Sequence, residues 1–346
     1  MKTIKINKVI FLLALSIIIG INTIKAQETT GFFELVKKGT ASYDNKDYVN
    51  AGKLLSKAAD LTQYKPGGAD GFNAAYNAAC SWSLANDLDK AFEQLNKVAD
   101  NVFFTNYYDQ MLKDSDFKNL YQDSRWKKIC ERINNTKIRF EANLNKTLVK
   151  ELDSIRQNDQ ADRLKALEYE KKYGGQSDEA KGQWKIVEEK DKKDLEKVKA
   201  IVGEDHWPGV KEVGFDGNQT IFLVIQHADL KTQLEFLPIM QSAVSKGNAM
   251  PKDYAYLVDR VSLRQGKKQV YGSQLVRDGK TGKMLYPAPL IDPETVDVRR
   301  EQVGLEPMAT YLQQNGLDWN VENYKAMLAE KEKKAKISIR NSVNKF

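Results

Sequence analysis

The residues of this chain best suited to acid–base chemistry are its two histidines, His206 and His227, which both lie in a polar stretch over residues 206–274. An imidazole exchanges a proton near neutral pH, and a neighbouring carboxylate fixes the orientation of its ring. His227 is followed by Asp229 and, further along, by Asp259. We therefore expect His227, Asp229 and Asp259 as candidate catalytic residues. The structural alternative is a core histidine that is hydrogen-bonded to a neighbour.

A second set of polar residues in the same stretch is suited to binding a polar ligand. An arginine guanidinium holds a carboxylate or phosphate through two parallel hydrogen bonds, and glutamine, tyrosine and tryptophan side chains add single donors or acceptors. Each type also has a structural use, since a tyrosine on a strand packs and a buried arginine forms a salt bridge. The candidate ligand-binding residues are Gln226, Arg260, Tyr271, Gln274 and Trp207.

The spacing of these residues along a helix predicts which of them face the same way. One helix is expected through residues 221–238, because apolar residues continue across that stretch at helical spacing. On such a helix Gln226 and Asp229 share one face, and His227 points about a quarter-turn away, toward apolar side chains. Asp229 or Asp259 is then the carboxylate expected to orient His227.

Several familiar enzyme classes have no motif in the sequence. The chain has no Cys-x-x-Cys or His-Glu-x-x-His spacing and no Gly-x-Ser-x-Gly motif. The turn Gly279-Lys280-Thr281 lacks the upstream glycine of a phosphate-binding loop. Cys80 and Cys130 are expected as two unpaired thiols, although an oxidising compartment permits a disulfide between them. We therefore expect no metal site and no cofactor.

The first 26 residues predict export from the cytoplasm. Three lysines precede an apolar run over residues 9–21, and Ala26 ends a small-residue cleavage site. The apolar run is shorter than the roughly 20 residues that span a bilayer. Removal of residues 1–26 takes away four lysines and no acids, so the formal net charge falls from +7 to +3. We expect a periplasmic or extracellular protein with no transmembrane segment after cleavage and no nucleic-acid partner.

Residues 32–100 predict four helices arranged as two hairpins. Small residues recur with the same separation in both hairpins, as they do where two helices approach closely. The positions are Gly39 and Ala51 in the first hairpin, and Ala79 and Ala91 in the second. Aspartate-led turns at residues 114–117 and 123–126 predict capped helices that close the array. The pattern resembles tetratricopeptide repeats, which implies a protein or peptide partner.

The rest of the chain is expected to be mainly helical. Residues 134–203 carry an apolar stripe of helical period, and Asp159 and Arg163 within it are interpreted as an intrahelical ion pair rather than as catalytic residues. An Asp-Gly pair predicts a β-hairpin over residues 269–286 whose first strand carries the segment 271–274. The expected fold class is mainly α, with tetratricopeptide-like helical hairpins followed by an α-rich domain with one β-hairpin.

A set of short motifs over residues 144–311, about half the chain, resembles a bacterial family of secreted proteins known only as a domain of unknown function. The resemblance implies no established activity, and a preceding repeat module is similar to arrangements in that family. Ser273 departs from the family pattern, in which threonine is more usual. The matching residues are Asp159-Gln160, Trp207-Pro208, Gln226-His227-Ala228-Asp229, Asp259-Arg260, Gln269, Tyr271-Gly272-Ser273-Gln274 and Asp292-Pro293.

Two hypotheses about function follow from this organisation. The first is an exported protein whose repeat module binds a protein or peptide partner and whose C-terminal domain binds a polar small molecule. The alternative is a metal-independent hydrolase or transferase that uses His227 as general acid or base. Both require the separate polar motifs to face one common hollow. The expected parts are a signal peptide at 1–26, a tetratricopeptide-like module with end cap at 27–133, an α-rich domain at 134–318, and a C-terminal helix with a basic tail at 319–346.

Overall fold

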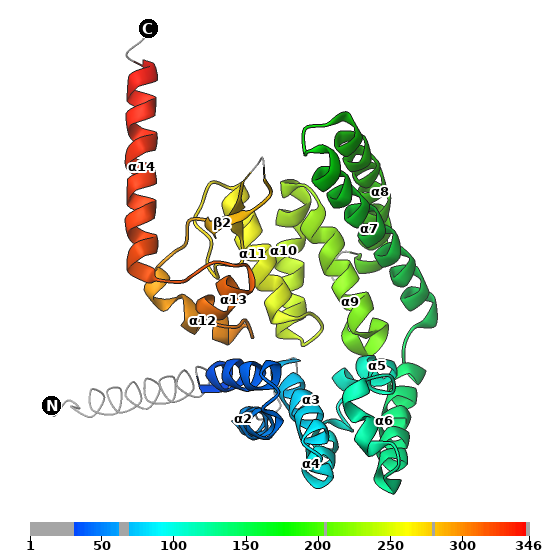
Figure 1. Cartoon of the computed structure of the whole chain (residues 1–346). Helices are drawn as coiled ribbons and strands as arrows, with labels where there is room; N and C mark the ends of the chain where they lie inside the picture. The colour runs from blue at the N-terminus through cyan, green and yellow to red at the C-terminus, as the bar shows by residue number, and fades with distance from the viewer. Residues whose placement is uncertain (1–30, 62–68, 204–205, 279–280, 344–346) are drawn as a thin grey trace, which may run out of the picture. The chain divides into compact units, whose positions relative to one another are not determined.

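A computed structural model describes residues 31–61, 69–203, 206–278 and 281–343. The expected signal peptide lies outside these residues, as do Gly279 and Lys280 of the hairpin turn. The described residues are mainly α-helical, with one two-stranded antiparallel sheet (Figure 1), which confirms the expected fold class. The chain divides into two compact units, residues 1–142 and residues 143–346, each with its own apolar core.

The first unit contains the four helices expected before residue 100, followed by short helical turns and one longer helix. Its elements are a helix over residues 31–44, α2 (Tyr48–Leu61), α3 (Ala69–Leu84), α4 (Leu88–Val98), η1 (Val102–Tyr107), α5 (Tyr108–Met111), η2 (Ser115–Leu120) and α6 (Ser124–Ala142). Asp87 caps α4 and Asp114 caps η2 through their side chains. Cys80 and Cys130 are free thiols, as expected.

Small residues let the helices of the first unit approach closely. A Cβ added at Gly39 would lie 2.7 Å from the Leu55 side chain, and one added at Gly52 would lie 2.6 Å from the Trp82 ring. Ala51 in α2 has no exposed surface. Burial of the larger side chains that surround these positions supplies most of the stabilising free energy of such a module.

The second unit begins with five long helices and ends with smaller elements around a second core. The helices are α7 (Lys146–Tyr173), α8 (Asp178–Val202), α9 (Val210–His227), α10 (Leu230–Ser245) and α11 (Pro251–Arg264). After them come β1 (Leu275–Arg277), β2 (Met284–Pro287), η3 (Pro293–Thr295), α12 (Val296–Gln302), α13 (Met308–Gln314) and α14 (Val321–Val343). The second core is formed by Leu290, Val296, Met308, Leu312 and Tyr324.

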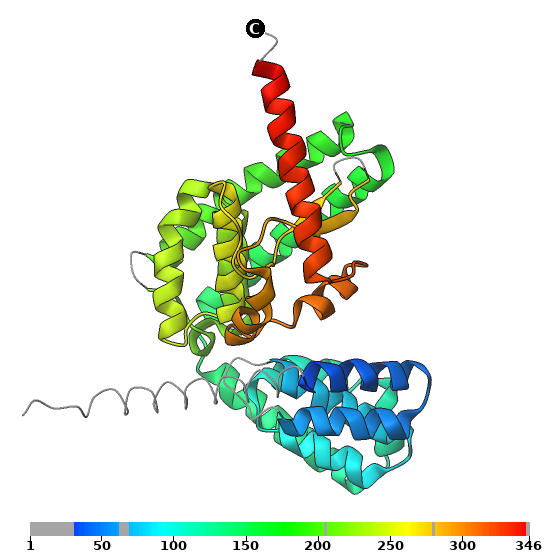
Figure 2. The same ribbon diagram turned by 90° about the vertical axis from the view of Figure 1, so that its left-hand side faces the viewer.

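The helices α7 and α8 form a long hairpin that breaks at Gly174, and α9 packs beside it. Figure 2 shows α14 extending away from the other elements of the second unit, with its C-terminal end at the tip. Within the part of the chain that the structure describes, no helix has the length and apolar character needed to cross a membrane.

Two expectations about local structure were wrong. The single helix expected through residues 221–238 is two helices, because α9 ends at His227, Ala228 is extended, and Asp229 starts α10 as its N-cap. Pro238 is tolerated inside α10 rather than ending it. The segment 271–274 lies in a loop before β1 and not on the first strand, because its backbone N–H groups bond to a carboxylate instead of a neighbouring strand.

The substitution Gly52→Ala is expected to destabilise the first unit. The new methyl group would collide with the rigid, buried Trp82 ring at 2.6 Å, and overpacking of this kind costs about 1–3 kcal/mol. This exceeds the gain of about 1 kcal/mol from replacing a helical glycine by alanine. Urea denaturation followed by tryptophan fluorescence measures the change.

The matched control is Gly182→Ala in α8, where no atom lies within 4 Å of the added Cβ. That substitution is expected to raise the free energy of unfolding by up to about 1 kcal/mol. An equally large stabilisation by Gly52→Ala would contradict the close contact between α2 and α3.

Candidate functional site

His227 is held by a carboxylate from a distant part of the second unit. Its Nδ1 atom lies 3.2 Å from Oδ1 of Asp159, in the middle of α7. The Asp159 side chain is 5% exposed and the His227 side chain 20% exposed. Because an ionised carboxylate only accepts hydrogen bonds, Nδ1 carries the proton and donates it. The other ring nitrogen, Nε2, is then the one free to exchange a proton with a ligand.

Asp159 is also the centre of a wider polar network. Its Oδ1 accepts a second hydrogen bond from Arg163 Nε at 2.9 Å, and its Oδ2 accepts one from Gln160 Nε2 at 2.6 Å. Arg163 in turn binds both carboxylate oxygens of Asp191 in α8, at 2.8 and 2.7 Å. The network therefore joins α7, α8 and the end of α9. The ion pair expected between Asp159 and Arg163 is confirmed, but it is only part of this larger arrangement.

The pKa values of the two carboxylates in the network are shifted in opposite directions. Burial raises the pKa of Asp159, but the hydrogen bond and charge of His227, together with the Arg163 guanidinium, outweigh burial and lower it to about 2. For Asp191, burial is the largest effect and raises the pKa even though Arg163 opposes it. Asp159 is thus kept ionised, which is the state that orients an imidazole.

Two arginines of α11 bind the last carbonyls of α9 on either side of His227. Arg260 Nη1 donates to the Gln226 carbonyl at 2.9 Å, and Arg264 Nη1 donates to the Ala228 carbonyl at 2.7 Å. Gln233 Nε2 also donates to the Gln226 carbonyl, at 2.8 Å. The side-chain oxygen of Gln226 is buried and accepts no hydrogen bond from the described residues. Arg260 thus contacts the main chain next to His227, and the Gln226 side chain is buried.

Asp259 has a different surrounding from the one expected. It is fully buried, and its two oxygens accept hydrogen bonds from the backbone N–H groups of Val270 (2.6 Å), Tyr271 (2.9 Å) and Ser273 (2.8 Å). Both oxygens are therefore engaged with backbone, and Asp259 fixes the loop over residues 269–274 rather than orienting His227.

Buried side chains complete this loop. Gln269 Oε1 accepts from the Gln274 N–H at 2.9 Å, and Arg300 Nη1 donates to the Tyr271 carbonyl at 2.8 Å. The Gln274 side chain donates to Ser273 Oγ at 3.1 Å. Gly272 has a φ of 73°, and a Cβ there would lie 2.7 Å from Met308 Sδ. The backbone at Gly272 therefore lies in close contact with α13.

The remaining candidate residues lie elsewhere. Asp229 accepts from the Thr232 N–H at 2.8 Å as the N-cap of α10. Trp207 precedes the start of α9, at the opposite end of that helix from His227, and is buried in the core. His206 is exposed and lies 3.2 Å from Glu212. The polar motifs around positions 207, 226–229, 259–260 and 271–274 thus do not surround a single hollow.

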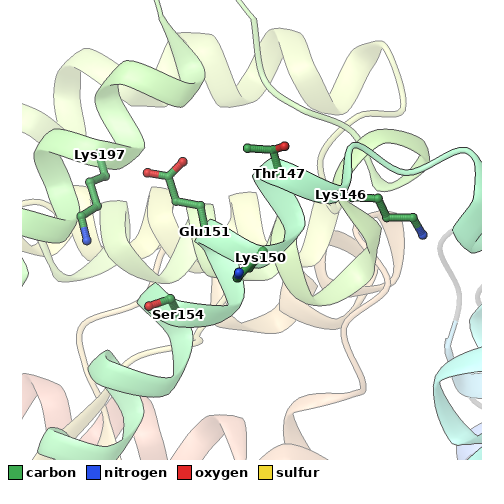
Figure 3. Close-up of a pocket in the computed structure, with 6 residues that line it drawn as sticks. All are labelled: Lys146, Thr147, Lys150, Glu151, Ser154 and Lys197. Atoms are coloured by element: carbon green, nitrogen blue, oxygen red, sulfur yellow. The ribbon is translucent and has the colours of Figure 1, made fainter.

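A surface hollow of about 630 Å³ lies between α7 and α8 (Figure 3). None of the candidate residues from the sequence lines it. Three lysines and one glutamate give it a mixed, mainly basic lining, and Figure 3 shows no converging set of side chains. The lining residues are Lys146, Thr147, Lys150, Glu151, Ser154 and Lys197. The Asp159–His227 pair has the more specific chemistry.

In the first unit, one group of metal-ligating side chains occurs among the described residues: Cys80, Asp114 and Asp116. The carboxylates already accept hydrogen bonds from tyrosines, with Tyr76 Oη 2.7 Å from Asp114 and Tyr43 Oη 2.5 Å from Asp116. Burial and then the negative charge of Asp114 raise the pKa of the Cys80 thiol. Cys80 Sγ also lies 3.9 Å from Asp114, so the group is a hydrogen-bonded polar cluster between α3 and η2.

The second unit is thus a mainly α domain in which a buried carboxylate holds a partly exposed histidine. A family model described as a family of unknown function, DUF6624, matches residues 146–319, and the chain belongs to this family. The expected membership of a domain-of-unknown-function family is confirmed over these residues. A search of curated proteins gives no match, and a search of solved structures gives none either.

Asp159 and Asp191 were missed as site residues by sequence reasoning. Asp159 was assigned to an ordinary ion pair because Arg163 follows it at helical spacing, while its contact with His227 spans 68 residues. The available signal was the Asp159-Gln160 pair among the family-like motifs. Asp191 lies in a charge-rich helix where nothing distinguishes it from its neighbours.

The lowered pKa of Asp159 predicts a specific loss of stability in acid. Its pKa falls from 3.8 in the unfolded chain to about 2 in the folded one, so the ionised form stabilises the fold above pH ~4 by about 2 kcal/mol. This contribution disappears as the pH falls from about 4 to 2. Urea denaturation at pH 5 and pH 2.5 should show the loss in the unsubstituted chain. The variant Asp159→Asn should lack that component, and an identical acid loss in both would contradict the ion pairing.

Asp253 predicts the opposite pH dependence. It is 5% exposed, its carboxylate accepts no hydrogen bond from the described residues, and burial raises its pKa from 3.8 to about 6. Ionisation of this group therefore destabilises the fold above pH ~6, by up to about 3 kcal/mol. Asp253→Asn should raise the melting temperature at pH 7.5 and should have little effect at pH 3.5. A melting temperature that falls equally at both pH values would contradict the unpaired burial of this carboxylate.

Proposed function

We propose that the second unit binds a polar small molecule against His227 and catalyses hydrolysis or group transfer, with His227 as general acid or base. The observation that carries the proposal is the hydrogen bond of 3.2 Å between His227 Nδ1 and the buried Asp159 carboxylate. Such a carboxylate holds one tautomer of the ring and stabilises the imidazolium that forms on proton uptake. His227 Nε2 is then the acceptor for a proton from water or from a ligand hydroxyl.

Partial exposure supports this role for His227. A purely structural histidine is expected to have both ring nitrogens engaged and the ring enclosed, because an unpaired buried nitrogen is unfavourable. The His227 side chain is 20% exposed, and only Nδ1 has a partner among the described residues. Arg260, from α11, donates to the main-chain carbonyl of Gln226, the residue before His227.

Asp159 is the positioning residue in this proposal. Its second partner, Arg163, is itself fixed by Asp191, so the carboxylate cannot rotate away from His227 without also breaking its ion pair with Arg163. A site whose orienting group is locked in this way is preorganised for proton transfer. The low pKa of Asp159, about 2, keeps this group ionised across the physiological pH range.

The experiment compares His227→Gln and Asp159→Asn with the unsubstituted chain in a panel of chromogenic esters and phosphate monoesters. General acid–base catalysis contributes about 10²–10⁴-fold, so both variants should lose at least 100-fold in kcat, with KM changing less. His206→Gln is the matched control, because His206 is the other histidine and lies exposed beside Glu212. It should keep full activity.

The acylating reagent diethyl pyrocarbonate gives a second readout that needs no substrate. His227 should be acylated at Nε2, and Asp159→Asn should slow the reaction because the imidazole loses its orienting carboxylate. A chain without turnover on any panel compound contradicts the catalytic role, as does full activity of His227→Gln.

A further inference from the structure

The two arginines of α11 near His227 lack the ion pairs that the neighbouring acids of α7 and α8 have. Arg163 pairs with both Asp159 and Asp191, and Lys197 lies 3.5 Å from Asp194. Among the described residues, neither Arg260 nor Arg264 forms an ion pair, although both lie beside the His227 main chain.

The contacts that Arg260 does make use only part of its guanidinium. Nη1 donates to the Gln226 carbonyl at 2.9 Å, and no described residue accepts a hydrogen bond from Nε or Nη2. The guanidinium is a planar group of five donors, two of which can bind the two oxygens of one anion in parallel. The carbonyl contact therefore fixes the group in place and leaves part of its donor capacity unused.

Leaving such a group unpaired is unfavourable, because a desolvated charge requires a counter-charge. Burial lowers the pKa of Arg260, and the positive charges of Arg264 and Arg163 lower it further. Capping the end of α9 explains the one hydrogen bond that Arg260 donates to the Gln226 carbonyl. A single donor is sufficient for capping, so the other donors of Arg260 are not explained by it. A second function explains why two guanidiniums meet at this point without a carboxylate.

We propose that Arg260, assisted by Arg264, binds an oxyanion group of the ligand, a carboxylate or a phosphate, beside His227. The proposal rests on the function proposed above, since it names the ligand class of the same site. The exposed Arg264 draws the anion toward the site, and the half-buried Arg260 holds it through paired hydrogen bonds. The reacting bond of the ligand then lies next to the oxyanion, within reach of His227 Nε2.

The presence of only two histidines allows a direct test by NMR. The full chain is labelled at histidine and titrated with inorganic phosphate, with acetate in a second arm, and with chloride at matched ionic strength as the reference. His206→Gln assigns the two imidazole signals. At least one of the two anions should shift the His227 signal saturably in the millimolar range, whereas the His206 signal should follow chloride. A response to phosphate alone or to acetate alone identifies the oxyanion.

Substitutions at Arg260 test the assignment of the binding group. Arg260→Gln should weaken the anion at least tenfold, while it keeps an amide donor for the Gln226 carbonyl. Arg260→Lys should weaken binding less, because the charge remains but the paired donors are lost. Arg156→Gln is the matched control, since Arg156 lies on α7 and pairs with Gln219 and Asp216. Its affinity for the anion should be unchanged.

Two outcomes would overturn the proposal: no saturable shift of the His227 signal with either anion, or equal anion affinity in Arg260→Gln and in the unsubstituted chain. Melting temperatures of all variants show whether a loss of binding is merely a loss of fold, and Arg260→Lys supplies a second, milder variant. Anion binding that depends on Arg260, in a chain where His227→Gln keeps full activity, would contradict the catalytic role and leave the ligand class supported. Loss of activity in His227→Gln without any anion binding would support the catalytic role and contradict the ligand class.

Discussion

The arrangement of the second unit depends on one buried carboxylate that accepts hydrogen bonds from two side chains at once. Asp159 accepts from His227 and from Arg163 through the same oxygen, and Arg163 continues the connection to Asp191. Three consecutive helices, α7, α8 and α9, are thereby joined by charged hydrogen bonds rather than by apolar contacts alone. Such a network specifies relative position more strictly than packing does, because its bonds are directional.

Three of the buried aspartates of the second unit have different surroundings. Asp159 is balanced by charged partners, and Asp259 by three backbone N–H groups. Asp253 has neither kind of partner among the described residues, and its pKa is raised to about 6 by burial. The comparison shows that burial alone does not define the state of a carboxyl group. Asp159 and Asp253 are similarly buried, yet the pKa of Asp159 is lowered and that of Asp253 is raised, because only Asp159 has His227 and Arg163 beside it.

Much of the helical content could be predicted from the sequence, because it depends on local periodicity. The small residues at Gly39 and Ala51, for example, correctly marked two helices that approach closely. The end of α9 at His227 could not be predicted from the same pattern, since apolar residues continue past it. The signal for the break was Asp229, a good N-cap, which was interpreted as a candidate catalytic side chain.

The candidate site could be predicted only in part. His227, Gln226 and Arg260 were identified by residue type, and in the structure Arg260 donates to the main-chain carbonyl of Gln226, the residue before His227. The partner of His227 was missed because Asp159 lies 68 residues before it, and no local rule links the two. Trp207, Asp229 and Asp259 share the same polar motifs, but their surroundings in the structure are those of core packing, helix capping and loop anchoring.

The loop that wraps around Asp259 is bound through amide groups of the main chain at positions 270, 271 and 273. Every amino acid except proline carries such a group, so the anchoring is indifferent to which side chains these three positions display. At Val270 and Tyr271, which are partly exposed, the side chain is therefore free to change by substitution while the path of the loop stays the same. A protein built in this way can acquire a new preference for what it contacts there without having to fold differently.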